Sequence, residues 1–342
     1  MPKPCRIGVL GLTHDHIWDN LSQAVAHPDA RLVAAADPNQ ELLGRVEREF
    51  HCRPYSNFDT LLDSEDLDAV YIYSDNARGP ELTEMAAARG LHVLIEKPMA
   101  ADLAGAQRMQ TAAREAQVRL LVNWPFAWWP QLQHALRLAG DGEIGRLWQV
   151  RYRAAHAGPQ ELGCSSFFCD WLFDPARNGP GGAFMDYCCY GALLARVLLG
   201  LPTTVTAVGG RFVKQEISVE DNAVLIMKYA DGLAVSEGSW TQIGNLSAYT
   251  TLIYGTRGTL MLEPRTGGRL FLATADQPEG SPVAVPQPPA HLQNATAHFL
   301  HHIATGEPPQ ALCDQLHGRD TQEILEAGAR SLANGAEVSL PL

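Results

Sequence analysis

The 342-residue sequence has no long hydrophobic run, no excess of positive charge and no signal-peptide pattern. Its apolar runs are short and broken by charged residues, so we expect no transmembrane helix and no membrane partner. The first residues, Met1–Arg6, contain no apolar core of the kind that directs secretion, which predicts a cytoplasmic protein. The net charge of −12 argues against nucleic acid as a partner, because its phosphates require a basic surface.

Paired cysteines are also missing. The chain has seven cysteines and no CxxC pair: Cys5, Cys52, Cys164, Cys169, Cys188, Cys189 and Cys313. An odd number without regular spacing predicts reduced thiols, and neither a disulfide framework nor a zinc site. His14 and His16 flank Asp15 in the sequence, but a metal there would compete with the dinucleotide turn described below. We therefore expect no metal site.

What the sequence does contain is two regions with different patterns. In residues 1–123, short apolar runs alternate with helical segments of about ten residues, which predicts a doubly wound, parallel α/β sheet. The expected strands lie near 6–11, 31–36, 67–73, 92–96 and 119–122. From residue 147 onward, runs of period two separated by turns predict a mainly antiparallel sheet. Long helices are expected near 182–199, 291–305 and 314–334, and a proline-rich loop near 278–289. We expect residues 124–342 to form an α+β domain.

The expected strand His92–Glu96 runs directly into Lys97 and Pro98. Glu and Lys are costly to bury unless they are paired or used, and Pro98 forces the chain to leave the sheet. Ligands of open α/β sheets bind outside the carboxyl ends of the strands, so Lys97 is a candidate for proton chemistry. The alternative is a solvated Glu–Lys pair in a loop.

A glycine turn follows the first expected strand, with Gly8 and Gly11 followed by Leu12, Thr13 and His14. Such a turn lets a pyrophosphate approach the backbone at a helix N-terminus, which Thr13 or Asp15 is expected to cap. The motif is incomplete, because His14 occupies the place of its third glycine. Asp37 ends the second expected strand, where a carboxylate accepts both ribose hydroxyls and repels a 2′-phosphate, which favours NAD over NADP. A plain Asp-Pro turn is the alternative interpretation.

Together these motifs resemble the Gfo/Idh/MocA oxidoreductases, the family of glucose-fructose oxidoreductase and inositol dehydrogenase. The segment Leu91–Pro98 matches the most diagnostic motif of this family, and the resemblance continues through Ser74–Asn76, Trp171–Pro175, Gly181–Asp186 and the C-terminal Val338–Pro341. It implies an NAD-binding Rossmann domain followed by an α+β domain with an open sheet. It also implies that Ser74, Asn76 and Glu96 help to hold the cofactor, and that the open sheet forms a homodimer or homotetramer.

The third motif is Asp186–Tyr190, whose two end residues are four apart and share a helical face. Much of the family has a His at the place of Tyr190 and an Asp at the place of Leu193. Tyrosine replaces that His in the glucose-fructose oxidoreductase and dihydrodiol dehydrogenase branches. An adjacent Lys97 ammonium is expected to lower the pKa of Tyr190, so that the pair relays a proton. By resemblance, Asp186 holds a substrate hydroxyl; the alternative for Tyr190 is a purely structural, buried tyrosine.

Three further residues are candidates for substrate contact: His156, Trp171 and Trp124. His156 follows the first strand of the second region and could face the pocket, although a single His is more often structural. Trp171 belongs to the family-like entry into the inserted helix. Trp124 could line the nicotinamide site or the face of a sugar, and an aromatic core is the alternative.

These interpretations favour an NAD(H)-dependent oxidoreductase acting on a secondary alcohol or ketone of a sugar or polyol, with the hydride chemistry supplied by the nicotinamide. Two alternatives remain open. One is a non-catalytic regulator that binds NAD, suggested by the incomplete glycine motif and the missing His. The other is a lyase or glycosidase that oxidises a sugar transiently and regenerates its NAD.

Overall fold

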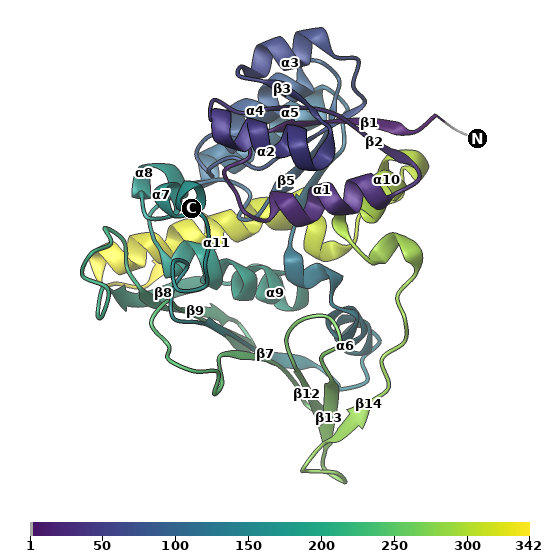
Figure 1. Ribbon diagram of the computed structural model, residues 1–342. Coiled ribbons are helices and arrows are strands. Elements are labelled where there is room, and N and C mark those ends of the chain that lie inside the picture. The colour runs from purple at the N-terminus through teal and green to yellow at the C-terminus, as the bar shows by residue number, and fades with distance from the viewer. Residues whose placement is uncertain (1–2) are drawn as a thin grey trace.

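The computed structural model describes residues 3–342. Met1 and Pro2, the start of the segment considered for a signal peptide, lie outside the described residues. The chain forms two sheets, one in the upper and one in the lower part of Figure 1, with helices between them. Within residues 3–342, no helix is both long and apolar enough to cross a bilayer. All seven cysteines are unpaired, as expected.

The first sheet has six strands in the order β3-β2-β1-β4-β5-β6, and every neighbouring pair is parallel. Its strands are β1 Cys5–Leu10, β2 Ala30–Ala36, β3 Arg53–Tyr55, β4 Ala69–Ile72, β5 His92–Glu96 and β6 Leu120–Asn123. The helices between them are α1 Ile17–Ala26, α2 Gln40–Phe50, α3 Phe58–Ser64, α4 Gly79–Ala87 and α5 Leu103–Glu115. This arrangement confirms the predicted doubly wound sheet. The sequence did not reveal β3 and α3, because a three-residue strand containing Pro54 is too short to show a period.

The second sheet has nine strands in the order β14-β13-β12-β11-β7-β10-β9-β8-β15. They are β7 Leu147–Ala155, β8 Thr204–Gly210, β9 Asn222–Tyr229, β10 Gly232–Ser239, β11 Tyr249–Gly255, β12 Gly258–Leu262, β13 Leu270–Thr274, β14 Ser281–Val283 and β15 Val338–Ser339. Only β7 and β10 pair in parallel, so the predicted, mainly antiparallel sheet is confirmed. The proline-rich segment 278–289 is not entirely a loop, because β14 adds to the sheet edge there.

Helices cover one face of this second sheet and leave the other open (Figure 1). Its strands contact α6 Pro130–Gly140, α9 Cys189–Leu199 and α11 Gln315–Asn334. The same part of the chain also forms α7 Ser166–Leu172, α8 Pro175–Asn178 and α10 Ala295–Thr305. The helix predicted at 182–199 begins as a π-helical turn, Phe184–Cys188, and continues as α9. Turns of this kind occur often at functional sites.

Helix α10 returns to the first sheet. The hydroxyl groups of Tyr71 in β4 and Thr296 in α10 are 2.8 Å apart and hydrogen-bonded, and the Phe299 ring lies 6.1 Å from the Tyr71 ring. Residues of α10, near the C-terminal end of the chain, therefore pack into the core of the first sheet. The division at residue 123 remains a prediction.

His298 in α10 gives a testable prediction about acid stability. Its Nε2 accepts a hydrogen bond from the Gln310 N–H, and its Nδ1 is buried with no partner among residues 3–342. Burial, reinforced by His302 and His291, lowers the pKa of His298 to about 4. Between about pH 6.5 and pH 4 the unfolded chain binds a proton that the folded chain excludes, so folding stability falls as the pH falls, by at most about 3 kcal/mol.

A His298→Gln variant cannot titrate, and we expect urea unfolding to show a shallower loss of stability from pH 7 to pH 4.5. The matched control is His27→Gln at the end of α1, which should keep the wild-type slope. An equally steep slope in His298→Gln would contradict this account.

Candidate active site

Lys97 and Asp186 form a buried ion pair where the carboxyl edge of the first sheet meets the π-helical turn. The Nζ of Lys97 donates to Asp186 Oδ1 at 2.8 Å and to the Asp186 carbonyl oxygen at 3.2 Å. Only 3% of the Lys97 side chain and 11% of the Asp186 side chain are exposed. Burial opposes the charge on Lys97, but the Asp186 carboxylate has the larger effect and raises the pKa of Lys97. Burial also opposes the charge on Asp186, but Lys97 has the larger effect and lowers the pKa of Asp186. The lysine is therefore a fixed ammonium.

Trp240 holds the second carboxylate oxygen of Asp186. It directly follows β10, is fully buried, and donates from Nε1 to Asp186 Oδ2 at 3.2 Å. The sequence analysis did not find Trp240, because it lies 54 residues from Asp186 in a segment without a motif. Its bond fixes the orientation of the carboxylate toward Lys97.

The Tyr190 ring lies beside this pair. Lys97 Nζ is 4.8 Å from the ring centroid, and the ring stacks on Tyr152 at 5.7 Å. No group among residues 3–342 hydrogen-bonds to its hydroxyl. Burial raises the pKa of Tyr190 well above its ordinary value. The neighbouring ionisable groups of Cys189 and Tyr152 act on this pKa in the same direction. The expected lowering of this pKa is therefore wrong. The ammonium lies over the ring face and is already neutralised by Asp186, so the phenol remains a neutral donor.

The turn after β1 fits a dinucleotide. Gly11 has φ +87°, and a Cβ there would lie 2.8 Å from the Ser74 backbone nitrogen, so the position requires glycine. The backbone N–H groups of Thr13 and Asp15 have no acceptor among residues 3–342, which leaves them available to a pyrophosphate. Gly8 instead lies inside β1, where a Cβ would lie 2.7 Å from the Leu67 side chain.

Asp37 sits beside this turn, at the end of β2. Its Oδ2 accepts from the Leu12 N–H and its Oδ1 from the Asn39 N–H, both at 2.8 Å. Burial raises the pKa of Asp37 and these hydrogen bonds oppose the rise. Each oxygen keeps a lone pair, so the carboxylate can still accept ribose hydroxyls.

Neither Thr13 nor Asp15 caps α1, contrary to expectation. The helix begins at Ile17 without a side-chain cap. The Asp15 carboxylate instead accepts from the Ser165 N–H at 2.7 Å and the Ser165 hydroxyl at 2.6 Å. This carboxylate is used to join the two regions of the chain.

Residues 165–178, which we call the clasp, cross from the second region over the cofactor turn. Trp171 Nε1 donates to the Thr13 carbonyl at 3.3 Å, and the His14 ring lies 4.7 Å from Phe168. At the other end, Asn76 Nδ2 donates to the side-chain oxygen of Asn178 at 2.8 Å. Trp171 thus contacts the cofactor turn.

Glu96 is buried at the end of β5. Its Oε1 is 3.0 Å from His16 Nδ1, and its Oε2 accepts from Asn123 Nδ2 at 2.7 Å. The ligand atoms of His14, His16 and Glu96 lie within 4.8 Å of one another, close enough for one metal ion. However, His14 Nδ1 already accepts the His16 N–H at 3.2 Å, and both Glu96 oxygens are engaged. The absence of a metal remains a prediction.

The remaining substrate candidates differ in position. His156 is buried next to Tyr187, with ring centroids 5.1 Å apart, and its Nδ1 accepts the Gly158 N–H at 2.8 Å. Because burial lowers the pKa of His156, the ring is neutral, and this bond assigns its proton to Nε2. Trp124 is fully buried, 5.6 Å from the Tyr190 ring, and its Nε1 has no partner among residues 3–342. Among residues 3–342, the Ser74 hydroxyl donates only to the Asp75 carbonyl.

Residues 5–124 match the model of an oxidoreductase family with an NAD-binding Rossmann fold, and residues 132–261 match the GFO/IDH/MocA C-terminal domain. A D-apiose dehydrogenase of Paraburkholderia graminis is 29% identical, over 97% of this chain and 88% of its own. A dTDP-3,4-didehydro-2,6-dideoxy-alpha-D-glucose 3-reductase of Actinomadura kijaniata is 26% identical, over 96% and 97%.

Among solved structures, a levoglucosan dehydrogenase in complex with NADH and levoglucosan superposes with a TM-score of 0.83. It is 21% identical, over 99% of this chain and all of its own. Three observations support the same assignment: the two family models that the sequence matches, the two sheets, and the glycine turn after β1. The chain belongs to the Gfo/Idh/MocA oxidoreductase family and is an NAD(P)-dependent oxidoreductase with an NAD-binding Rossmann domain.

Proposed function

We propose that this protein catalyses hydride transfer between NAD and a secondary alcohol or ketone of a sugar or polyol. The observation that carries the proposal is the Lys97 ammonium, which is buried and held by Asp186 directly after the strand that ends at the cofactor edge. The names of the relatives, which are sugar dehydrogenases and reductases, support the substrate class.

The bound nicotinamide supplies the hydride chemistry, and the protein supplies placement and electrostatics. In the proposal, Lys97 donates to the reacting oxygen and stabilises its developing negative charge. Tyr190 contributes a neutral hydroxyl as proton donor, while Asp186 fixes the ammonium and orients a substrate hydroxyl. His156 offers its Nε2–H to a substrate oxygen. Trp124 packs edge-to-face against the Tyr190 ring and holds it in place.

We assign cofactor binding to the turn, the ribose carboxylate and the strand ends that surround them. The proposed residues are Gly8, Gly11, Leu12, Thr13, His14, Asp37, Ser74, Asn76, Glu96 and Lys97. Gly8 and Asn76 act indirectly, through strand packing and through the clasp. Trp171, proposed above for the substrate, is reassigned to the wall of the cofactor turn because of its bond to Thr13.

Asp37 predicts the cofactor preference. In an Asp37→Ser variant the carboxylate that accepts the ribose hydroxyls is lost, and so is its repulsion of a 2′-phosphate. We expect NADH to bind at least about tenfold more weakly, corresponding to about 1.4 kcal/mol, while NADPH binds more tightly. Quenching of tryptophan fluorescence measures both affinities. The control is Asp29→Ser, an exposed site in the turn before β2. An unchanged ratio of NADH to NADPH affinity in Asp37→Ser would refute the role.

A substrate panel separates the proposed function from its two alternatives. Sugars and polyols are incubated with NAD or NADH, and both absorbance at 340 nm and the products are followed. The proposal requires stoichiometric change of nicotinamide and substrate. A regulator would bind NADH and exchange no hydride with any panel member, whereas a redox-initiated lyase or glycosidase would cleave a bond without net NADH.

We further propose that the open face of the second sheet joins copies of this chain into a dimer or tetramer. Large apolar side chains lie partly exposed on several of its strands, namely Trp148, Ile226, Leu233 and Met261. Sedimentation equilibrium of the wild type and of Ile226→Asp tests this, since the variant should shift toward monomer. A monomeric wild type would refute it. The cytoplasmic location also remains a prediction.

A further inference from the structure

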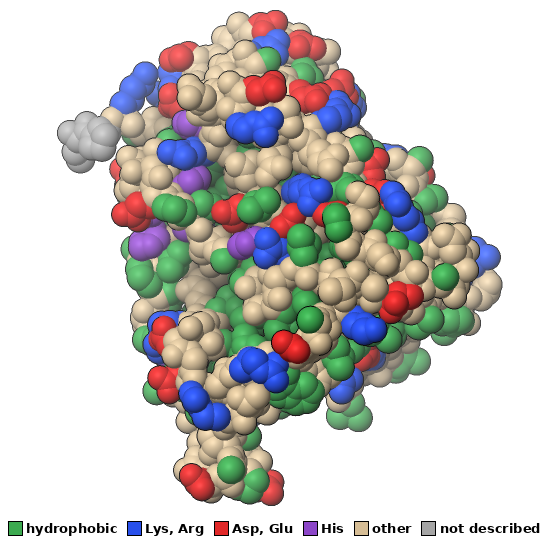
Figure 2. All heavy atoms as spheres, turned by 180° about the vertical axis from the view of Figure 1, so that it is seen from behind, with side chains coloured by type: hydrophobic (Ala, Val, Ile, Leu, Met, Phe, Trp, Pro, Cys, Tyr) green, Lys and Arg blue, Asp and Glu red, His purple; other side chains and the backbone are tan. Residues whose placement is uncertain are grey.

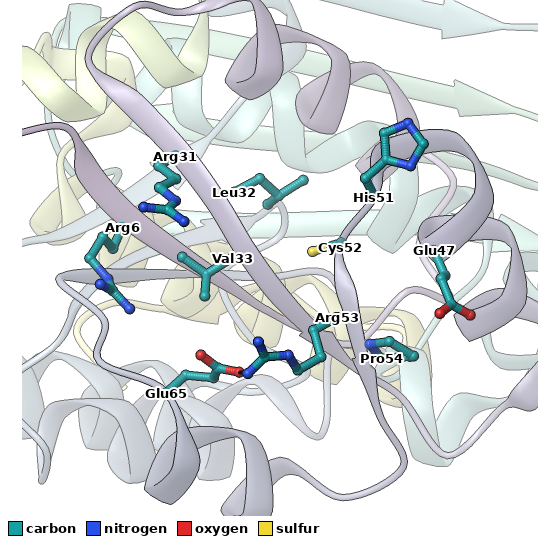
Figure 3. Close-up of a pocket in the computed structure, with 10 residues that line it drawn as sticks. All are labelled: Arg6, Arg31, Leu32, Val33, Glu47, His51, Cys52, Arg53, Pro54 and Glu65. Carbon is teal, nitrogen blue, oxygen red and sulfur yellow. Dashed lines mark hydrogen bonds and ion pairs between the residues drawn. The ribbon is translucent and has the colours of Figure 1, made fainter.

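A hollow lies at the amino ends of β1, β2 and β3, the opposite edge of the first sheet from the cofactor turn. It has a volume of about 600 Å³, and three arginines line it: Arg6, Arg31 and Arg53 (Figure 3). We call it the arginine hollow. Strand β1 separates Arg6 from Gly11 by five residues, or about 16 Å, so the hollow is distinct from the pyrophosphate site.

Strand register brings the three arginines close together at this edge of the sheet. Arg6 pairs with Arg31 across β1 and β2. After a register shift between Ile7 and Gly8, Gly8 pairs with Ala34, which in turn pairs with Arg53 of β3. In Figure 3 Arg6 and Arg31 lie on one side of the hollow, the Arg53 guanidinium lies against Glu65, and Glu47 lies on the opposite side. Like charges on directly opposed residues are destabilising unless an anion lies between them.

The carboxylates of the protein neutralise this group only in part, because they pair with Arg53 and Arg6 but not with Arg31 among residues 3–342. Glu65 accepts from Arg53 and also from the Tyr55 hydroxyl. The Arg6 guanidinium reaches Asp66 at 3.4 Å, and the Asp66 side chain is 78% exposed. The backbone N–H of Arg6 donates to the Asp68 carboxylate at 2.8 Å. Arg31 forms no ion pair within residues 3–342, and the Nε of Arg6 is buried there without an acceptor. The guanidinium groups of Arg6 and Arg31 therefore have N–H donors that are available to a ligand, in a chain whose net charge is −12.

Guanidinium groups bind phosphate through paired N–H donors, and several together prefer a dianion. The hollow is larger than one phosphate, and Leu32, Val33 and Pro54 give it an apolar wall. We propose that the arginine hollow binds the phosphate group of a small phosphate ester, with the organic part of the ester against that wall. The site is independent of the hydride-transfer function.

The test uses the full chain saturated with NADH, so that the dinucleotide turn is filled. Glucose 6-phosphate, inorganic phosphate and glucose are each titrated by calorimetry. We expect glucose 6-phosphate to bind, glucose not to bind, and Arg31→Gln to weaken binding at least about tenfold, which is the loss expected for one charge-assisted contact. The control is Arg108→Gln, an exposed arginine of α5 paired with Glu84.

Arg31 is exposed, so we expect Arg31→Gln to fold with an unchanged or higher melting temperature, because one repulsion is removed. Stabilisation of the wild type by glucose 6-phosphate, and its loss in Arg31→Gln, would support the site without calorimetry. Equal binding of inorganic phosphate would support the phosphate contact and refute recognition of the organic part. No binding at about 20 mM ester, or equal binding by Arg31→Gln, would overturn the proposal.

Discussion

Replacement of Lys97 by methionine is expected to lower kcat by about 100- to 10,000-fold, the range typical of one proton-transferring group. The variant keeps the volume of the side chain and loses the ammonium that contacts Asp186. NADH affinity should fall far less than kcat, since Lys97 is only one of the proposed cofactor contacts and the turn and Asp37 remain intact. Steady-state kinetics with the best panel substrate measure kcat, and tryptophan fluorescence measures NADH binding.

A structural effect of this variant can be separated from a catalytic one. Removing Lys97 leaves the Asp186 carboxylate buried with only the Trp240 bond, and breaking a buried ion pair typically costs about 3 to 5 kcal/mol of stability. The double variant Lys97→Met, Asp186→Asn removes that charge, so it should regain most of the stability and none of the turnover. Lys228→Met on the open sheet is the control for loss of a lysine. Recovered turnover in the double variant would mean that Lys97 serves only the fold.

Tyr190→Phe should lower kcat by about 100-fold or more, because it removes only the proposed proton donor. The ring remains stacked on Tyr152, so the melting temperature should stay close to that of the wild type. Since the pKa values of Tyr190 and Lys97 are both raised, neither group loses its proton below about pH 10. The wild-type kcat should therefore show no alkaline fall between pH 7 and pH 9.5.

Tyr71→Phe is the matched control, since it removes another buried tyrosine hydroxyl, the one bonded to Thr296. It should lose some stability and keep full turnover. Full turnover in Tyr190→Phe would instead support the structural interpretation of Tyr190 and leave Lys97 as the sole proton donor. An alkaline fall centred near pH 8 would point to a different titrating group.

Both sheets were predictable because their strands are long enough to show a period. The buried parallel strand His92–Glu96 and the alternating strand Asn222–Tyr229 illustrate the two patterns. Strand β3 and the short helix α8 were missed, because three or four residues carry no period. Strand β14 was missed for the same reason, and the prolines of the segment 278–289 around it favoured a loop.

Site residues that lie within one sequence motif were predictable. Site residues that depend on contacts between distant segments of the chain were not. Lys97 stands out because a charged residue directly follows a buried strand. Trp240 and the Asp15–Ser165 contact join residues 54 and 150 positions apart, which no local pattern reveals. The pKa of Tyr190 was predicted in the wrong direction, because a sequence shows a neighbouring charge but not the burial or the counter-ion.

The most direct test of the central claim, that Lys97 supports hydride transfer to a substrate carbon, is a single-turnover reaction with NADH that carries deuterium at both C4 positions. The panel ketone that turns over fastest is mixed with the wild type or with Lys97→Met, each saturated with labelled NADH, and the product is analysed by mass spectrometry. We predict one deuterium in the wild-type product and at least about 100-fold slower labelling by the variant. Labelling at the wild-type rate by Lys97→Met, or no deuterium in any product of the wild type, would contradict the account.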